Sequence, residues 1–472
     1  MSNYIPTMGL EVHVEIKSNS KLFSSSANTY GMATNTSVNV IDLGYPGTLP
    51  TLNKEIIRQG IRACKVLNCN ITRKMHFDRK NYFYPDNPKN YQITQNRTPI
   101  GTNGYVEIEV DGIKKKIGIS DIHIEEDTCK SAHRGNVSLL DFNRAGVPLI
   151  EIVTEPCISN SKEAIVYLIK LRELLFYANI SDCKMEEGSM RCDANVSISK
   201  TEKLGTRTEI KNISSIHNVG LALDKEIERQ EEALENGGVI REETRRFDER
   251  RGETILMRVK ETGNDYRYFI EPDIPYLVVT DEFIEDSLKA LPLLPDELRE
   301  KYKEVGLTSL QIEKLIANRS LNDYFLGLLE FKTNYVTAVN LLLSDISSYL
   351  NKHNKVITDT KLSYEKLVEV IENLESRELS NKNIKDLIDS LMETDKTLAE
   401  LKKEFNIQNI TDDSFINEII TKVIENNPDS VNDYKSGHDR ALKYLMGQVM
   451  KETKGSVNPK KASDMLVKEL NK

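Results

Sequence analysis

The chain has 472 residues, of which 39% are hydrophobic and 29% charged, with 23 glycines and 14 prolines. This is the composition of a folded globular protein of about three domains, and it excludes wholesale disorder, collagen-like repeats and disulfide-stapled miniproteins. Against 64 lysines and arginines stand 73 aspartates and glutamates, a net charge of −9, so any contact with nucleic acid must be confined to a local basic surface.

The cysteines and the apolar segments indicate the cell compartment of the protein. All six cysteines lie in the first 192 residues without any Cys-x-x-Cys pair, so we expect small buried thiols rather than a zinc site. No apolar stretch approaches the ~18 residues of a membrane span, and the N-terminus has neither a secretory signal nor an arginine-rich leader. We therefore expect a protein of the reducing cytoplasm with no membrane contact.

The chain changes character near residue 292. Before this point, short alternating segments broken by glycine and proline predict a strand-rich α+β domain, with helices at 54–68, 161–177 and 221–235. From Leu293 onward helical periodicity dominates, and a break near 401–411 separates two helical blocks. The pattern predicts a catalytic domain at 1–292, a helical domain at 293–405 and a small helical tail domain at 406–472.

Three predicted strands carry charged side chains on one face. In residues 10–16 strict alternation puts Glu11 and His13 opposite an apolar face, and residues 121–127 repeat the pattern, with Glu125 on one face and Glu126 on the other. Glu151 is a lone carboxylate in the apolar run 148–153, where a charge needs a partner or a metal. If the strands converge, their carboxylates and the histidine form an oxygen-rich site suited to Mg²⁺; a solvated strand face is the alternative.

Two further segments contain candidate functional residues. Residues 78–92 combine Lys80 and Lys89 with four aromatics and two prolines, which is typical of a rigid functional loop, although an aromatic surface loop is equally compatible. Arg191 and Asp193 share one face of a predicted strand, where a structural ion pair is an open alternative.

Common nucleotide and hydrolase motifs are missing from the sequence. There is no P-loop, no Gly-x-Gly-x-x-Gly opening a helix, no Gly-x-Ser-x-Gly elbow and no His-Glu-x-x-His. Two regions are locally basic: residues 241–258, and residues 435–472 with nine lysines or arginines against four acids. Either region could contact phosphates, although basic faces are more often simply solvated.

Taken together and in this order, these segments resemble the B subunit of the tRNA-dependent amidotransferases that convert Glu-tRNA(Gln) or Asp-tRNA(Asn) to the amidated form. The tail resembles the YqeY family through LMGQVMKETKGSVNP at 445–459. The motifs that carry the main resemblance are GLEVHVE at 9–15, DLGYPGTLP at 42–50, DRKNYFYPDNPKNYQITQ at 78–95, IEEDTCKS at 124–131, DFNRAGVPLIEIVTEP at 141–156, KMEEGSMRCDANVS at 184–197, ETRRFDE at 243–249 and RVKETGNDYRYFIEPDIP at 258–275.

The resemblance implies a fold and an activity. It implies a cradle-shaped catalytic domain, a helical domain and a YqeY-like tail that binds tRNA. It further implies that the protein transfers the γ-phosphate of ATP, with Mg²⁺, to the side-chain carboxylate of the misacylated tRNA, and that ammonia then displaces the phosphate. The ammonia would come through a channel from an amidase, the A subunit, in a heterotrimer with a small C subunit.

The resemblance also implies residue roles. The family's metal site maps to His13, Glu11, Glu125 and Glu151. Glu126 matches a residue that gates the ammonia path, Lys80 and Lys89 match residues of that path or the adjoining pocket, and Arg191 and Asp193 fall in the segment RCDAN of the site.

The sequence is also compatible with two other hypotheses. The chain could be chiefly a tRNA-binding scaffold whose carboxylates are structural, or a metal-dependent phosphohydrolase that acts alone. The sequence does not choose between glutamate and aspartate as the substrate side chain.

Overall fold

The computed structural model describes residues 3–259, 266–376, 378–379, 381–405, 407, 413–453, 457 and 459–471. The chain divides into two compact units, Met1–Pro295 and Asp296–Lys472. The predicted boundary at 292/293 lies close to this division. The further boundary predicted at 405/406 involves residue 406, outside the described residues, and stays a prediction. No helix in the described part of the chain is long and apolar enough to cross a membrane.

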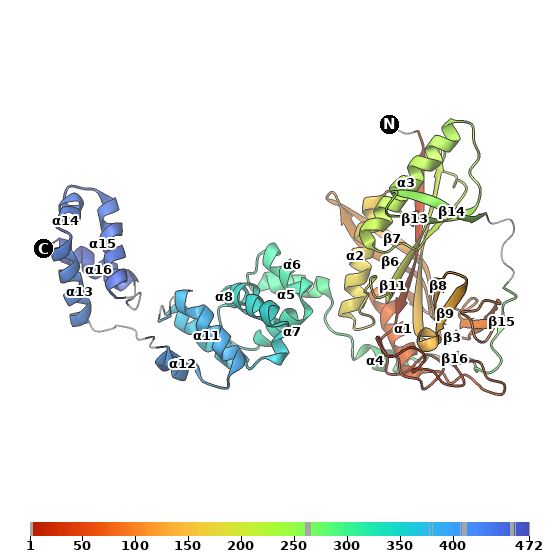
Figure 1. The fold of residues 1–472 in the computed structure, drawn as a ribbon, viewed down its shortest axis with the longest axis horizontal. Helices are drawn as coiled ribbons and strands as arrows, with labels where there is room; N and C mark the ends of the chain where they lie inside the picture. Colours follow the sequence, from red (N-terminus) through yellow and green to blue (C-terminus); the bar gives the residue numbers. More distant parts are fainter. Residues whose placement is uncertain are drawn as a thin grey trace. The chain divides into compact units, whose positions relative to one another are not determined.

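The first unit is built on a nine-stranded sheet (Figure 1). Its order is β14-β13-β12-β11-β1-β10-β7-β6-β2, so β1, the first strand of the chain, lies at its centre. The strands are β1 (Ile5–Glu15), β2 (Asn70–Ile71), β6 (Gly101–Val110), β7 (Ile113–Glu126), β10 (Pro148–Thr154), β11 (Met190–Ser199), β12 (Thr208–Lys211), β13 (Glu243–Asp248) and β14 (Glu253–Val259).

Alternation of polar and apolar residues gives the sheet two unlike faces. On β1, Leu10, Val12 and Val14 are fully buried in the main core, and the apolar residues opposite them on β10 and β11 join the same core. The residues between them point to the other face and are charged, as the sequence pattern predicts. One face of the sheet is therefore core and the other is available for chemistry.

Three helices cover the apolar face: α1 (Lys54–Val66), α2 (Ser161–Tyr177) and α3 (Ile216–Glu235). Each begins at a side-chain cap that satisfies a free backbone N–H, from Asn53, Asn160 and Ser215 respectively. The predicted helices at 54–68 and 161–177 are confirmed. The third begins at Ile216, five residues before its predicted start, because Ser215 provides the cap.

Short sheets and a fourth helix complete the first unit. The segment predicted as a functional loop forms part of a three-stranded sheet, in the order β15-β4-β5. Bounds of these smaller elements are β3 (Lys74–Met75), β4 (Asp78–Asn81), β5 (Tyr91–Thr94), β8 (Lys130–Arg134), β9 (Val137–Asp141), η1 (Phe142–Arg144), β15 (Phe269–Ile270), β16 (Leu277–Val278) and α4 (Asp281–Leu288).

Helices are the regular elements of the second unit in the part of it that the structure describes. Capping boxes start two of its helices, Thr308 with Gln311 and Thr397 with Glu400. Up to residue 405 the helices are α5 (Pro295–Glu304), which begins at the last residue of the first unit, α6 (Ser309–Ala317), α7 (Arg319–Leu328), α8 (Tyr335–Leu341), η2 (Leu342–Ile346), α9 (Ser347–His353), η3 (Ile357–Asp359), α10 (Tyr364–Glu375), α11 (Asn381–Glu393) and α12 (Leu398–Glu404).

The C-terminal helices share a small core of their own. Ile416, Ile420, Leu445, Val449 and Leu466 are buried in it. These helices are α13 (Asp413–Asn426), α14 (Pro428–Lys435), α15 (Asp439–Glu452) and α16 (Pro459–Leu470). A strand-rich first unit followed by helices confirms the predicted α+β class.

Candidate functional site

The candidate site lies on the charged face of the sheet, where four adjacent strands meet. The register pairs His13 of β1 with Glu151 of β10 on one side and with Arg191 of β11 on the other. Beyond β10, Glu151 pairs with His123 of β7. Because paired residues on adjacent strands have Cβ atoms about 5 Å apart, strands far apart in sequence bring these side chains into contact.

His13, Glu125 and Glu151 form a compact group. Nε2 of His13 lies 3.3 Å from Oε2 of Glu151 and 4.0 Å from Oε1 of Glu125. One ligand atom of each residue lies within 4.8 Å of the others. The donor set is one imidazole nitrogen and two carboxylates, and hard oxygen donors of this kind suit Mg²⁺. These residues therefore fit a divalent cation.

A second histidine orients the group. His123 contacts Oε2 of Glu151 through Nε2 at 2.9 Å and Oδ1 of Asp121 through Nδ1 at 3.1 Å. Burial lowers the pKa of His123, but the two carboxylates outweigh burial and raise it to about 10. Burial and the neighbouring charge of Glu151 raise the pKa of Glu125. Burial also acts to raise the pKa of Glu151, but His123 and His13 outweigh it and lower that pKa.

Glu11 belongs to a neighbouring acidic group rather than to this one. Its carboxylate lies with those of Asp193 and Glu209, one oxygen of each within 4.8 Å of the others. Asn195 donates to Glu11 at 2.9 Å, and Lys211 pairs with both Asp193 and Glu209. The lysine partly neutralises the charge of this group.

Residues of both groups line one large polar pocket, about 890 Å³ in volume. Glu11, His13, Glu151 and Asp193 line it from central strands of the sheet. The lysines and arginines that line it are Lys80, Arg191, Arg207, Lys211 and Arg258. Negative residues that can bind a metal and positive residues that can bind phosphate thus face the same space.

Glu126 points away from this group and pairs with Lys89. Its Oε1 accepts from the Lys89 ammonium and, at 2.9 Å, from the backbone N–H of Ile93. Both residues line a small cavity of about 10 Å³, which also touches Asp42 and Asp127. A space of that size holds one water-sized molecule.

Asp127, the next residue, accepts hydrogen bonds from two arginines. Its Oδ2 accepts from Nε of Arg144 at 2.5 Å and from Nη2 of Arg191 at 2.8 Å. Arg144 in turn lies 3.9 Å from Oε1 of Glu15. Burial and the nearby charge of Asp127 raise the pKa of Glu15 to about 7.

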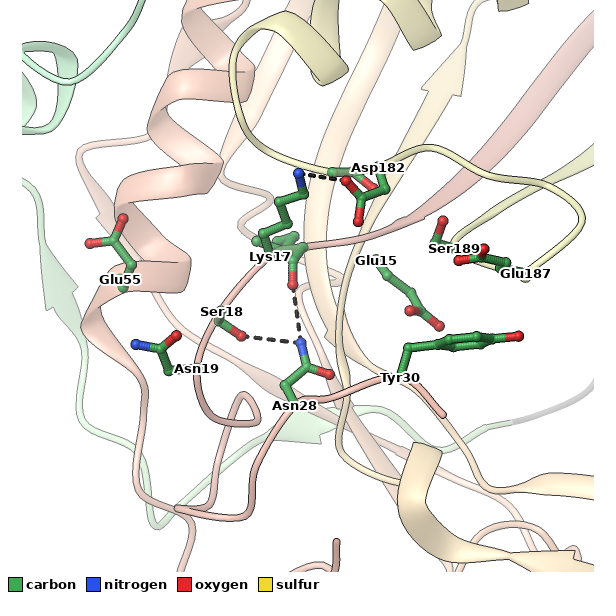
Figure 2. A pocket seen from close by; sticks show the side chains of 12 residues that line it. Glu15, Lys17, Ser18, Asn19, Asn28, Tyr30, Glu55, Asp182, Glu187 and Ser189 are labelled. Carbon is green, nitrogen blue, oxygen red and sulfur yellow. Dashed lines mark hydrogen bonds and ion pairs between the residues drawn. The ribbon is translucent and has the colours of Figure 1, made fainter. Parts of the chain in front are cut away.

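Glu15 also lines a second, separate pocket of about 430 Å³ (Figure 2). There Lys17 points toward Asp182, with Nζ 2.5 Å from Oδ1, and the Asn28 amide donates to Ser18 at 3.3 Å. None of the predicted site residues lines this pocket. It is therefore not the candidate site.

The structure brings most of the predicted residues together. Of the four predicted metal ligands, His13, Glu125 and Glu151 converge, whereas Glu11 lies in the adjacent group. Lys80, Arg191 and Asp193 line the main pocket, and Lys89 lies beside Glu126.

Sequence reasoning missed several charged residues of the site. Glu209 and Lys211 alternate with Ile210 in a short strand, and this alternation would have identified them. Asp127 was noticed only as part of a strand pattern, and Arg144 gave no local signal, because its partner lies on another element.

Comparisons with known proteins support the resemblance, and the matches extend over most of the chain. The family model described as the GatB/GatE catalytic domain matches residues 6–285, and a second model, described as a GatB domain, matches residues 323–470. Relatives named as the B subunit of aspartyl/glutamyl-tRNA(Asn/Gln) amidotransferase include that of Geobacillus thermodenitrificans, 48% identical over 100% of both chains. Those of Staphylococcus haemolyticus and Lysinibacillus sphaericus are 47% and 46% identical over 98% and 100% of both chains. The chain therefore belongs to the GatB family, the B subunits of these amidotransferases.

Proposed function

We propose that this protein phosphorylates the side-chain carboxylate of Glu-tRNA(Gln) or Asp-tRNA(Asn) with ATP and then amidates it. The observation that carries the proposal is the group of His13, Glu125 and Glu151. Two of its members, His13 and Glu151, line a pocket that Lys80 and Arg191 also line. Metal ligands beside fixed cations are what phosphoryl transfer requires, because the reaction is catalysed mainly by positioning and by charge stabilisation.

His13, Glu125 and Glu151 would hold Mg²⁺, with Glu11 at the edge of the same pocket. The bound cation would neutralise charge on the phosphates of ATP. His123 keeps Glu151 oriented, since it donates to the carboxylate from the adjacent strand.

The cationic residues of the pocket would hold the transferred group. The substrate carboxylate oxygen attacks the γ-phosphorus, ADP leaves, and an acyl phosphate forms. Lys80 and Arg191 lie where they can bind phosphoryl oxygens. Asp193 keeps Lys211 in the wall of the pocket through their ion pair.

Ammonia would reach the acyl phosphate past Glu126 and Lys89. It attacks the carbonyl carbon, phosphate leaves, and loss of a proton gives the amide. The pair lines a cavity of about 10 Å³ in the structure, a size that suits ammonia. We infer that the ammonia comes from glutamine hydrolysed by an amidase, the A subunit, in a heterotrimer with a small C subunit.

The helical part of the chain would bind the body of the tRNA. We propose a helical domain at 293–405 and a tail domain at 406–472, with a net charge of +5 over residues 435–472. Basic residues that contact phosphates release counterions, so binding through this tail should weaken steeply with salt.

The proposal is tested by ADP release from the heterotrimer in Mg²⁺, with and without Glu-tRNA(Gln) or Asp-tRNA(Asn). ADP release that requires a misacylated tRNA, followed by amide formation with glutamine, would support it. Intact tRNA binding without such ADP release would favour a scaffold role. Phosphate release from simple phosphate esters by the isolated chain would instead favour a phosphohydrolase.

A further inference from the structure

Three consecutive carboxylates at the end of β7 have three different sets of partners. Glu125 joins the group of His13, and Glu126 pairs with Lys89. Asp127 is the third. It lines the small cavity beside Glu126 and Lys89, but the proposed function gives it no role of its own. Its partners are Arg144 and Arg191.

Asp127 is held rigidly by its backbone and its side chain. Its N–H donates to the carbonyl of Val147 at 2.8 Å, and its carbonyl accepts from the N–H of Gly146 at 2.9 Å. Oδ1 accepts from the N–H of Thr128 at 2.8 Å, which leaves Oδ2 for the two arginines. The residue is 6% exposed. A carboxylate fixed in this way can define the position of a longer and more flexible side chain.

Arg191 is the partner that reaches the pocket. It lies on β11 directly opposite His13, it lines the main pocket, and its side chain is 39% exposed. Asp127 takes one N–H of Nη2, and the buried Nε of Arg191 has no hydrogen-bond partner among the described residues. A guanidinium with donors left over beside a pocket is suited to an anion, since arginine binds phosphate oxygens with two parallel hydrogen bonds.

We propose that Asp127 is a positioning residue that holds Arg191 with its remaining N–H groups toward the transferred phosphoryl group. This inference rests on the proposed function. Glu15 and Glu125 are acidic neighbours that also attract Arg191. Without Asp127, these two residues would compete for the charge of the guanidinium. The guanidinium would then move away from the place where charge develops in the transition state.

A double-mutant cycle separates positioning from a simple structural ion pair. The variants Asp127→Asn, Arg191→Ala and their combination are prepared in the heterotrimer. The rate of ADP release that depends on misacylated tRNA is measured over a range of ATP concentrations. We expect Asp127→Asn to lower kcat at least about tenfold, with the KM for ATP nearly unchanged. In the Arg191→Ala background, the same substitution should have almost no further effect.

Glu226→Gln is the matched control. Glu226 is also a buried carboxylate that pairs with two arginines, Arg229 and Arg245, but it lies on α3 and faces the core side of the sheet. Its substitution should reduce stability and leave kcat unchanged at temperatures where the variant is folded. If Asp127→Asn does not fold, Asp127→Glu applies the same test, because it keeps the charge but moves it by one methylene.

A binding measurement needs no turnover. We expect Asp127→Asn to weaken binding of ADP with aluminium fluoride, a phosphoryl mimic, about tenfold, while binding of ADP alone stays unchanged. The inference would be overturned by any of three results. These are a wild-type kcat in Asp127→Asn, an equal loss of kcat on this substitution in the wild-type and Arg191→Ala backgrounds, or binding of the phosphoryl mimic that is not weakened. Absence of tRNA-dependent ADP release from the wild-type heterotrimer would instead contradict the proposed function.

Discussion

Nε2 of His13 lies 3.3 Å from Oε2 of Glu151, and the two residues face each other directly across the antiparallel strands β1 and β10. The same oxygen is 2.9 Å from Nε2 of His123 on the next strand. Glu151 is therefore shared by both histidines and lies at the centre of the candidate metal group. Its charge holds together side chains from three strands.

Replacing this shared carboxylate should abolish the first chemical step. Glu151→Gln keeps the size of the side chain but removes a metal ligand and the charge that both histidines contact. We expect the tRNA-dependent rate of ADP release to fall by more than about 100-fold, with a weaker affinity for Mg²⁺. The matched control is Glu163→Gln, which removes an ion pair with Lys115 outside the pocket and should leave ADP release unchanged. Equal activity in both variants would contradict the metal assignment.

Replacing the carboxylate that pairs with Lys89 should uncouple the two half-reactions. Glu126→Gln removes the charge that binds the lysine, but it leaves the metal group intact. We expect ADP release to persist, while amide formed per ADP falls about tenfold with glutamine as donor, because the acyl phosphate is hydrolysed instead. The ratio is measured by counting ADP and Gln-tRNA or Asn-tRNA in the same reaction. A parallel loss of ADP and amide would argue against a role in the ammonia path.

The buried carboxylate of Glu226 should make the free energy of unfolding depend on pH. Burial by itself raises the pKa of Glu226, but hydrogen bonds from Arg229 and Thr254 outweigh burial and lower this pKa below its ordinary value of 4.5. Its folded pKa lies below its unfolded pKa, so the stabilisation is present above about pH 4.5 and is lost as the pH falls through the folded value.

Glu226→Gln should therefore reduce the free energy of unfolding by about 3 kcal/mol at pH 7. The difference from the wild type should shrink as the pH approaches 3. Urea denaturation of both proteins between pH 7 and pH 3 measures it. A difference that stays constant over this range would show that the charge of Glu226 does not contribute.

Basic residues on α15 should contribute to tRNA binding by charge alone. Arg440 and Lys443 are exposed, and neither forms an ion pair with a described residue. Replacing both by alanine should weaken binding of tRNA to the heterotrimer and reduce the slope of log affinity against log salt by about 2. The control is Lys162→Ala, an exposed lysine of α2 that pairs with Asp111. An unchanged slope would place the tRNA contacts elsewhere.

The sequence by itself determined the local character of this protein. Alternation over residues 10–16 predicted a strand with one charged and one apolar face, and the sequence pattern predicted the helix starts at 54 and 161. These features depend on neighbouring residues, so they can be read from a short window. The long motifs also identified the family, which the comparisons confirm.

Only the tertiary structure decided which charged side chains meet. Glu11 and His13 are two residues apart on the same face of β1, about 6.6 Å along the strand. They nevertheless belong to different groups, because Asp193 of β11 lies opposite Glu11 and Glu151 of β10 lies opposite His13. Likewise, Asp127 meets Arg144 and Arg191 because the chain folds back through η1 and β11. Strand order and register are non-local, and these distances are fixed by the folded core rather than by the sequence around each residue.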